Sequence, residues 1–307
     1  KMSENKERNI EYIDIEKLVI DVCNIRHGIW DADQELVRSI KEINILEPLI
    51  VRPIPPTPDG KCYGIICGSR RYNAAIEAGL TKVPCIVKQV DDVTAIGLSI
   101  MENKHRKDIP AWIYFEKIKK MNELLGGMKT TEKVKMIMAK TGFSKSTVYD
   151  YLALTELPEE TIELMKEPEE RSEEVKEYLK VTPPGGVTFL KEKPLSKDKA
   201  VKIATKLKEF SDEKKFEVAR FIAPLKEEVA VEIIEKVRMY PEKPLEEIKK
   251  MVEGIPKSVT WMPQFEWEPK LAKALDEACV KKNMDRKSLV TYYVREGLKR
   301  DGFLKEG

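Results

Sequence analysis

The chain has 307 residues, of which 42% are hydrophobic and 35% are charged, and its formal net charge at pH 7 is +2. This length and composition suggest a globular protein of two or three domains, and the small net charge excludes nucleic-acid binding through overall positive charge, so any such surface must be local. Apolar runs fall short of the roughly 18 to 20 residues that span a bilayer, and the charged N-terminus lacks the apolar core of a signal peptide, so a cytoplasmic, nucleoid-associated protein is expected.

Residues 1–110 alternate between strand and helix patterns, which predicts a small mixed α/β domain. Alternating apolar and polar residues at 13–20 predict one strand. A helix is expected from residue 33 to residue 43, with Asp31 as N-cap and Gln34 completing a capping box. Its apolar face is predicted to carry Leu36, Ile40 and Ile43; further strands are expected at 48–51, 63–67 and 83–87, a proline-rich loop at 53–60, and a helix at 91–105.

The run Gly-Ser-Arg-Arg at residues 68–71 lies where a buried strand turns into a short helix that ends at Gly79. Glycine at such a turn allows a ligand to approach the backbone, and a helix N-terminus offers unpaired N–H groups. Arg70 and Arg71 add fork-shaped donors that match phosphate oxygens. The pattern predicts a phosphate site, and the alternative is two solvated surface arginines.

A second polar cluster, Glu102, Asn103 and Arg106, ends the helix expected at 91–105. A carboxylate, an amide and an arginine one turn later are the residue types that hold a hydrated Mg²⁺ and a triphosphate. The alternative is an ordinary polar helix end. The five cysteines form no CxxC pair and only two histidines are present, which argues against zinc and for a reducing compartment.

Residues 111–180 are expected to form a helix-turn-helix DNA-binding domain. After a first helix with an apolar face, Thr130 is predicted to cap a second helix, Gly142 to form a tight turn, and Ser144 to cap a third helix with Val148 buried. The start of that third helix would face DNA, and the predicted contacts are Lys140, Ser144, Lys145, Ser146, Thr147 and Tyr149, beside Asp150. An ordinary helical hairpin is the alternative.

The remaining chain is expected to contain a helical region at 181–256 and a small dimerisation module at 257–307. A strongly acidic stretch at 158–177 would repel phosphates and should face away from DNA. In the module, a strand at 259–267 precedes two helices, the second capped by Asp285 and carrying Leu289, Val290, Val294 and Leu298. So short a segment cannot bury both apolar faces alone, which predicts a homodimer.

Four segments in this order resemble the ParB family of DNA-partition proteins when taken with the helix-turn-helix pattern that follows them. They are 18–26, 47–53 (EPLIVRP), 68–87 (GSRRYNAAIEAGLTKVPCIV) and 91–109 (DDVTAIGLSIMENKHRKDI). The resemblance covers about the first half of the chain. It implies an N-terminal domain that binds CTP with Mg²⁺, and a dimer that nucleotide binding closes into a clamp sliding on DNA. It also implies a partner ATPase of the ParA type.

The resemblance assigns nucleotide binding residue by residue, with Glu102 and Asn103 as the Mg²⁺ ligands. The residues so assigned are Arg26 in the first motif (residues 18–26), Gly68, Ser69, Arg70 and Arg71 in the second (68–87), and Glu102, Asn103 and Arg106 in the third (91–109). Three positions depart from the family, which usually has glutamate at Ser69, glutamine at His105 and proline at Ile25. These departures leave the base and the hydrolysis of the nucleotide open, so whether the protein is a weak CTPase is not decided.

The segment at 268–302 resembles the ribbon-helix-helix family more weakly, with Arg286 and Lys287 at a helix start as phosphate contacts. Glu266 and Glu268 disfavour DNA contact by the strand, so dimerisation is predicted as its main role.

The sequence therefore predicts an α+β protein, a sequence-specific partition protein whose dimer is controlled by nucleotide binding. One alternative is a transcription regulator with a vestigial pocket, which normal DNA retention by an Arg70→Ala, Arg71→Ala variant would favour. The other is a ParB-fold small-molecule kinase, which turnover of a small acceptor without DNA would favour.

Overall fold

The computed structural model describes residues 9–28, 33–106, 108–181 and 193–253, and in the last part of the chain residues 274, 277–279, 281–282 and 286–301. The chain divides into two compact units, Lys1–Glu253 and Gly254–Gly307. Several predicted features lie outside the described residues, namely Asp31, Asp285, the strand at 259–267 and most of the turn at 181–186.

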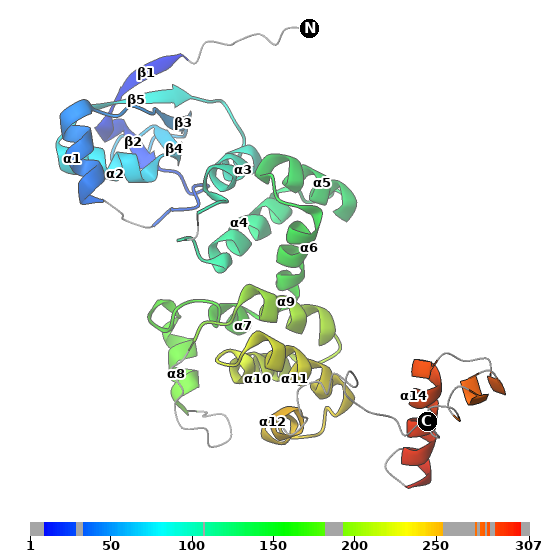
Figure 1. Ribbon diagram of the computed structural model, residues 1–307. Coiled ribbons are helices and arrows are strands. Elements are labelled where there is room, and N and C mark those ends of the chain that lie inside the picture. Colours follow the sequence, from blue (N-terminus) through cyan, green and yellow to red (C-terminus); the bar gives the residue numbers. More distant parts are fainter. Residues whose placement is uncertain are drawn as a thin grey trace. The chain divides into compact units, whose positions relative to one another are not determined.

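The first unit contains one five-stranded mixed sheet, in the order β1-β5-β3-β4-β2 (Figure 1). Its strands are β1 (Ile10–Asp14), β2 (Leu18–Ile20), β3 (Leu49–Pro53), β4 (Tyr63–Cys67) and β5 (Lys82–Val87). The β1–β5 and β3–β4 pairs are antiparallel, whereas β2–β4 and β3–β5 are parallel. The predicted α+β class is confirmed.

The single strand predicted at 13–20 is wrong, because the segment forms two strands at opposite edges of the sheet. A 3-10 turn at Ile15–Lys17 separates β1 from β2. The Ile15 amide donates to the Thr81 carbonyl at 2.9 Å, a contact made outside the strand ladder. Ile13 and Leu18 still bury into one cluster, so hydrophobic alternation alone does not reveal the break.

Helices cover both faces of the sheet. α1 (Gln34–Ile43) and α2 (Ser69–Ala78) pack against each other on one face, and α3 (Asp92–Asn103) packs against β4 on the other (Figure 1). Along β4, Ile65 belongs to the buried cluster that includes residues of α1 and α2, and Ile66 belongs to the buried cluster that includes residues of α3. This alternation is what a strand buried on both faces requires.

Two details of α1 correct the prediction. Its N-cap is Asp33, which accepts a hydrogen bond from the Glu35 amide at 2.9 Å, while Gln34 bonds to Glu77 of α2 instead of closing a capping box. Ile43 is 55% exposed, and Ile45 is buried in its place. Asn44 has a φ of 63°, so the chain reverses there and turns Ile45 inward.

The helical part of this unit shares one buried cluster that extends from Ile66 to Val252. Its helices are α4 (Ala111–Leu124), α5 (Thr130–Thr141), α6 (Lys145–Ala153), α7 (Glu159–Glu163), α8 (Glu173–Val181), α9 (Lys197–Lys206), α10 (Asp212–Ile222), α11 (Glu227–Met239) and α12 (Leu245–Glu253). The N-cap of α5 is Lys129, one residue before the predicted Thr130. Packing therefore continues from α3 through these helices without a break in the core.

In the second unit, α14 (Arg286–Arg300) follows helical turns at residues 277–279 and 281–282. Leu289 is buried, whereas Val294 is exposed in the single chain. The side chains of Arg286, Lys287 and Leu298 lie outside the described part of the structure. Pairing with a second copy stays a prediction.

Candidate functional site

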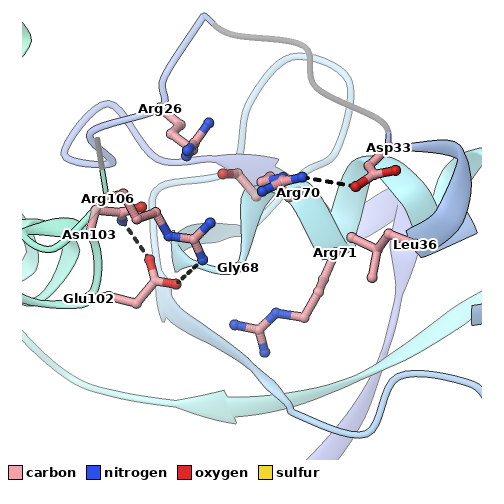
Figure 2. A pocket seen from close by; sticks show the side chains of 10 residues that line it. Arg26, Asp33, Leu36, Gly68, Arg70, Arg71, Glu102, Asn103 and Arg106 are labelled. Carbon is pink, nitrogen blue, oxygen red and sulfur yellow. Dashed lines mark hydrogen bonds and ion pairs between the residues drawn. The ribbon is translucent and has the colours of Figure 1, made fainter. Parts of the chain in front are cut away.

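A cavity of about 290 Å³ lies where the second motif meets the end of α3 (Figure 2). All eight residues predicted for nucleotide binding line it, together with Asp33 and Leu36 of the α1 region. These ten residues, called the arginine pocket below, are Arg26, Asp33, Leu36, Gly68, Ser69, Arg70, Arg71, Glu102, Asn103 and Arg106. Three motifs that are far apart in the sequence therefore converge on one cavity.

The turn into α2 can only be made by glycine. Gly68 is the N-cap of α2 with a φ of 97°, and a Cβ there would lie 2.6 Å from Leu49 Cδ2. A side chain would thus meet both backbone strain and a clash with a core residue. The first turn of α2 thus begins at the cavity wall, with Gly68, Ser69 and Arg70 among the lining residues, and a helix N-terminus favours anions.

The loop that carries Arg26 is held by hydrogen bonds to distant parts of the fold. Asn24 Nδ2 donates to the Ile65 carbonyl at 3.0 Å, and its Oδ1 accepts from the Arg26 amide at 2.8 Å. Ser99 of α3 accepts from the Ile25 amide at 2.8 Å. These bonds fix the backbone that places Arg26 on the cavity wall.

An ion-pair network centred on the buried Arg52 and Asp21 holds the start of this loop. Arg52 on β3 donates to both carboxylate oxygens of Asp21, at 2.6 and 3.0 Å, and to Asp92 at the start of α3 at 2.6 Å. Burial alone would raise the pKa of Asp21, but hydrogen bonds from Arg52 and from the Cys23 amide outweigh it, so the net pKa is lowered. The network joins the first-motif loop to the helix that carries the third motif.

The third motif closes the other side of the cavity. Glu102 accepts from Asn103 Nδ2 at 2.5 Å and pairs with Arg106 at 3.5 Å (Figure 2). Asn103 is buried, and its Nδ2 also donates to the Ser99 carbonyl at 2.9 Å. Glu102 thus presents a carboxylate, held by its neighbours, toward the cavity.

Within the described residues, no group of three or more His, Cys, Asp or Glu side chains could hold a metal ion. Glu102 and Asn103 could supply two oxygen ligands, and Mg²⁺ commonly takes only one or two from protein, with phosphate and water oxygens completing its shell. The predicted pair fits Mg²⁺ only together with a phosphate ligand.

Burial raises the pKa of the Cys67 thiol, next to Gly68 in the sequence, to about 12, so this cysteine is no nucleophile at neutral pH.

The two adjacent arginines do not act alike. Figure 2 shows their guanidinium groups pointing apart, with Arg70 toward Asp33. Arg71 donates to the carbonyl of Glu47 and, at 3.0 Å, to that of Pro48. Arg71 therefore holds the loop before β3, and Arg70 is the stronger candidate for a ligand contact.

The predicted DNA-contact residues lie mainly at the start of α6. Ser144 is the N-cap, with its side chain accepting from the Thr147 amide at 3.2 Å, and Lys145, Ser146 and Tyr149 are exposed. Lys140 lies apart from this group, because its Nζ donates to Thr94 of α3 at 2.9 Å. Asp150 pairs with Lys197 of α9 at 3.1 Å and so lies against that helix.

The helix α3 contacts both regions. Its far end carries Glu102 and Asn103, and at Gly97 it packs so closely on α5 that a Cβ would lie 2.8 Å from the Lys140 carbonyl oxygen. Lys117 of α4 donates to the Val22 carbonyl of the first-motif loop at 2.7 Å. The pocket and the α5–α6 pair are thus parts of one packed structure.

Sequence reasoning missed Asp33 and Leu36 as lining residues and did not assign Asp108, which pairs with Arg26. From the sequence, Asp33 could be identified only as a residue at the start of a helix.

Across the described ranges, no helix is both long and apolar enough to cross a membrane.

Residues 1–104 match the ParB N-terminal domain family. The chain is 35% identical to the chromosome-partitioning protein Spo0J of Thermus thermophilus over 176 residues, 57% of this chain and 61% of that protein. It is 32% identical to a probable chromosome-partitioning protein ParB of Vibrio cholerae over 155 residues, 48% of this chain and 50% of that protein. The chain thus spans 50–61% of the length of these relatives.

Among solved structures, a C-terminally truncated ParB of Caulobacter crescentus complexed with CTP-γ-S is 26% identical, covering 69% of this chain and 98% of that chain with a TM-score of 0.29. The same protein complexed to the centromeric parS site is 22% identical, covering 80% and 99% with a TM-score of 0.38. Because both scores are below 0.5, no argument rests on these structures. On the sequence matches, residues 1–104 are similar to the ParB N-terminal domain, and about half of the chain is similar to chromosome-partitioning proteins.

Proposed function

We propose that the protein is a DNA-binding partition protein whose arginine pocket binds CTP. The observation that carries the proposal is the convergence of three separated polar motifs on one cavity lined by four arginines. The relatives named chromosome-partitioning proteins support the partition role, and the family resemblance supports CTP among the nucleotides.

The pocket has the chemistry that a triphosphate needs. Arg26, Arg70 and Arg106 come from three different segments and surround the N-terminus of α2, whose amides favour anions. Guanidinium groups bind phosphate oxygens through paired hydrogen bonds. Glu102 and Asn103 would hold Mg²⁺ against the same phosphates, where the ion offsets part of their charge.

The exposed start of α6 would contact DNA. Its short polar side chains and Lys145 are the residue types that bind phosphates and base edges at a recognition helix. Since α3 carries the third motif and packs on α5, nucleotide in the pocket could change how a dimer of this protein holds DNA. A ParA-type ATPase partner belongs to the same proposal through the family resemblance.

Calorimetry with CTP, ATP and GTP in the presence of Mg²⁺ tests the nucleotide claim. We expect selective binding of CTP and a loss of about tenfold or more in affinity for Arg70→Ala, since a charge-assisted hydrogen bond contributes about 1.5–3 kcal/mol. Arg38→Ala, an exposed arginine of α1 outside the pocket lining, is the matched control.

The DNA claim is tested in parallel with a parS duplex and a scrambled duplex. Binding of DNA without binding of any of the three nucleotides would overturn the nucleotide role and leave a DNA-binding regulator with a vestigial pocket. Equal binding of both duplexes would overturn sequence specificity for parS.

A further inference from the structure

Arg70 and Arg26 of the pocket are paired with carboxylates that were not assigned to nucleotide binding. Arg70 NH2 lies 3.2 Å from Asp33 Oδ2, and Arg26 pairs with Asp108 (Figure 2 draws the first pair). The carboxylates come from the start of α1 and from the segment between α3 and α4. The donors proposed for phosphate are thus already bound to anions of the protein itself.

The partners in each pair differ in burial. The Arg26 side chain is 7% exposed and that of Asp108 is 53% exposed, and Arg70 is 30% exposed against 41% for Asp33. The buried Arg26 guanidinium cannot leave its position without losing its other contacts, whereas the exposed Asp108 carboxylate can rotate into water at little cost. If this pair opens, Asp108 moves and Arg26 stays on the cavity wall; at Asp33, Oδ2 can lose Arg70 while Oδ1 keeps its bond to the Glu35 amide.

The pairs are also weak enough to be replaced. Water can solvate the exposed carboxylate of each pair when the pair opens, whereas a phosphate can accept two parallel bonds from one guanidinium. Arg26 holds the pKa of Asp108 below its usual value, so this carboxylate is charged at neutral pH. A triphosphate that reaches Arg26 and Arg70 would therefore have to displace the two carboxylates that already pair with them.

We propose that Asp33 and Asp108 are internal competitors of the triphosphate, which occupy Arg70 and Arg26 in the empty pocket and lower its affinity for anions. The inference rests on the proposed function, since it concerns the same pocket. It assigns a role to two residues that the family resemblance does not: they hold the arginines in place before binding and release them when the phosphates arrive.

The geometry of Asp33 allows a variant that changes only the competition. Its Oδ1 caps α1 by accepting from the Glu35 amide, and its Oδ2 pairs with Arg70. Asp33→Asn can keep the capping oxygen, because asparagine is as good an N-cap as aspartate, while the amide nitrogen cannot accept from Arg70. Asp108→Asn removes the second competitor independently.

The test measures binding of Mg·CTP and of inorganic tripolyphosphate to the full chain by calorimetry. We expect Asp33→Asn and Asp108→Asn each to bind both ligands about two- to fivefold more tightly, the range set by an exposed ion pair, and the double variant to bind more tightly than either. Glu35→Gln removes a charge from the same helix outside the pocket lining and should leave both affinities unchanged.

Three results would overturn the inference. Unchanged affinity in both variants would show that the pairs do not compete, and weaker binding would show that the carboxylates assist the ligand, in each case with the proposed function intact. An equal gain in affinity for Glu35→Gln would show that the gain comes from the change in overall charge and not from loss of the ion pair. Absence of binding by wild type and every variant would instead overturn the proposed function, and this inference with it.

Discussion

The arginine pocket and the start of α6 are both polar surfaces, but their side chains are positioned in different ways. In the pocket, Arg26 depends on the Asn24, Ser99 and Arg52 contacts, which join the loop after β2 to β4, α3 and β3. At α6, Ser144 caps its own helix and so exposes the residues that follow it. Ligand binding in the pocket should therefore be lost through changes to the surrounding fold as well as to the lining residues, whereas DNA contact should be lost mainly through changes to single exposed side chains.

The largest effect is expected for Arg52→Met. It leaves the Asp21 carboxylate buried without its guanidinium, and loss of one partner of a buried pair costs about 3–5 kcal/mol. Chemical denaturation should show this fall in the free energy of unfolding, and CTP binding should fall with it. Arg38→Met, at an exposed position, is the control; equal stability of the two variants would contradict a supporting role for the network.

Gly68→Ala should come next. The residue needs a φ of 97° and its Cβ would lie 2.6 Å from Leu49, whereas Gly79 has a similar φ of 79° with nothing within 4 Å. Gly79→Ala should cost about 1–2 kcal/mol for the backbone alone, and Gly68→Ala more than that. Thermal denaturation of both variants separates the steric clash with Leu49 from the backbone strain that the two positions share. An equal loss of stability in the two variants would show that Leu49 moves aside.

The pH dependence of the free energy of unfolding should reveal the contribution of the Asp21 carboxylate. Because its folded pKa is lowered, the carboxylate stabilises the fold above its unfolded pKa of about 3.8, and this contribution is lost as pH falls through the lower folded pKa. The difference in stability between wild type and Asp21→Asn should be constant at neutral pH and shrink below about pH 3.8. A difference that grows on acidification would contradict the assigned direction.

The smallest effect is expected for Lys145→Ala. It should lower DNA affinity a few-fold and reduce the slope of log affinity against log salt by about 1, because one phosphate contact is lost, without changing stability. Fluorescence anisotropy across a salt series measures both, with Lys202→Ala of α9 as an exposed control. An unchanged slope would remove Lys145 from the DNA contacts.

Much of the local structure could be predicted from the sequence. The strand at Tyr63–Cys67, the stop of α2 at Gly79 and the Ser144 cap agree with expectation, because each depends on neighbours within a few residues. The break between β1 and β2 could not be predicted, because the Thr81 carbonyl that the Ile15 amide contacts lies far along the chain. The same limit hid Asp33 and Asp108, which meet Arg70 and Arg26 across 37 and 82 residues.

The sequence by itself determined which residue types could bind phosphate and where helices begin, since glycine turns, caps and hydrophobic periods are local. Only the tertiary structure decided which of these groups meet and which way each points. Arg70 faces the cavity while Arg71 turns to the backbone near Pro48, and Lys140 turns to Thr94 rather than to the start of α6. Such choices depend on burial and on partners from distant segments, and a charged side chain's direction is set by those partners rather than by its neighbours in sequence.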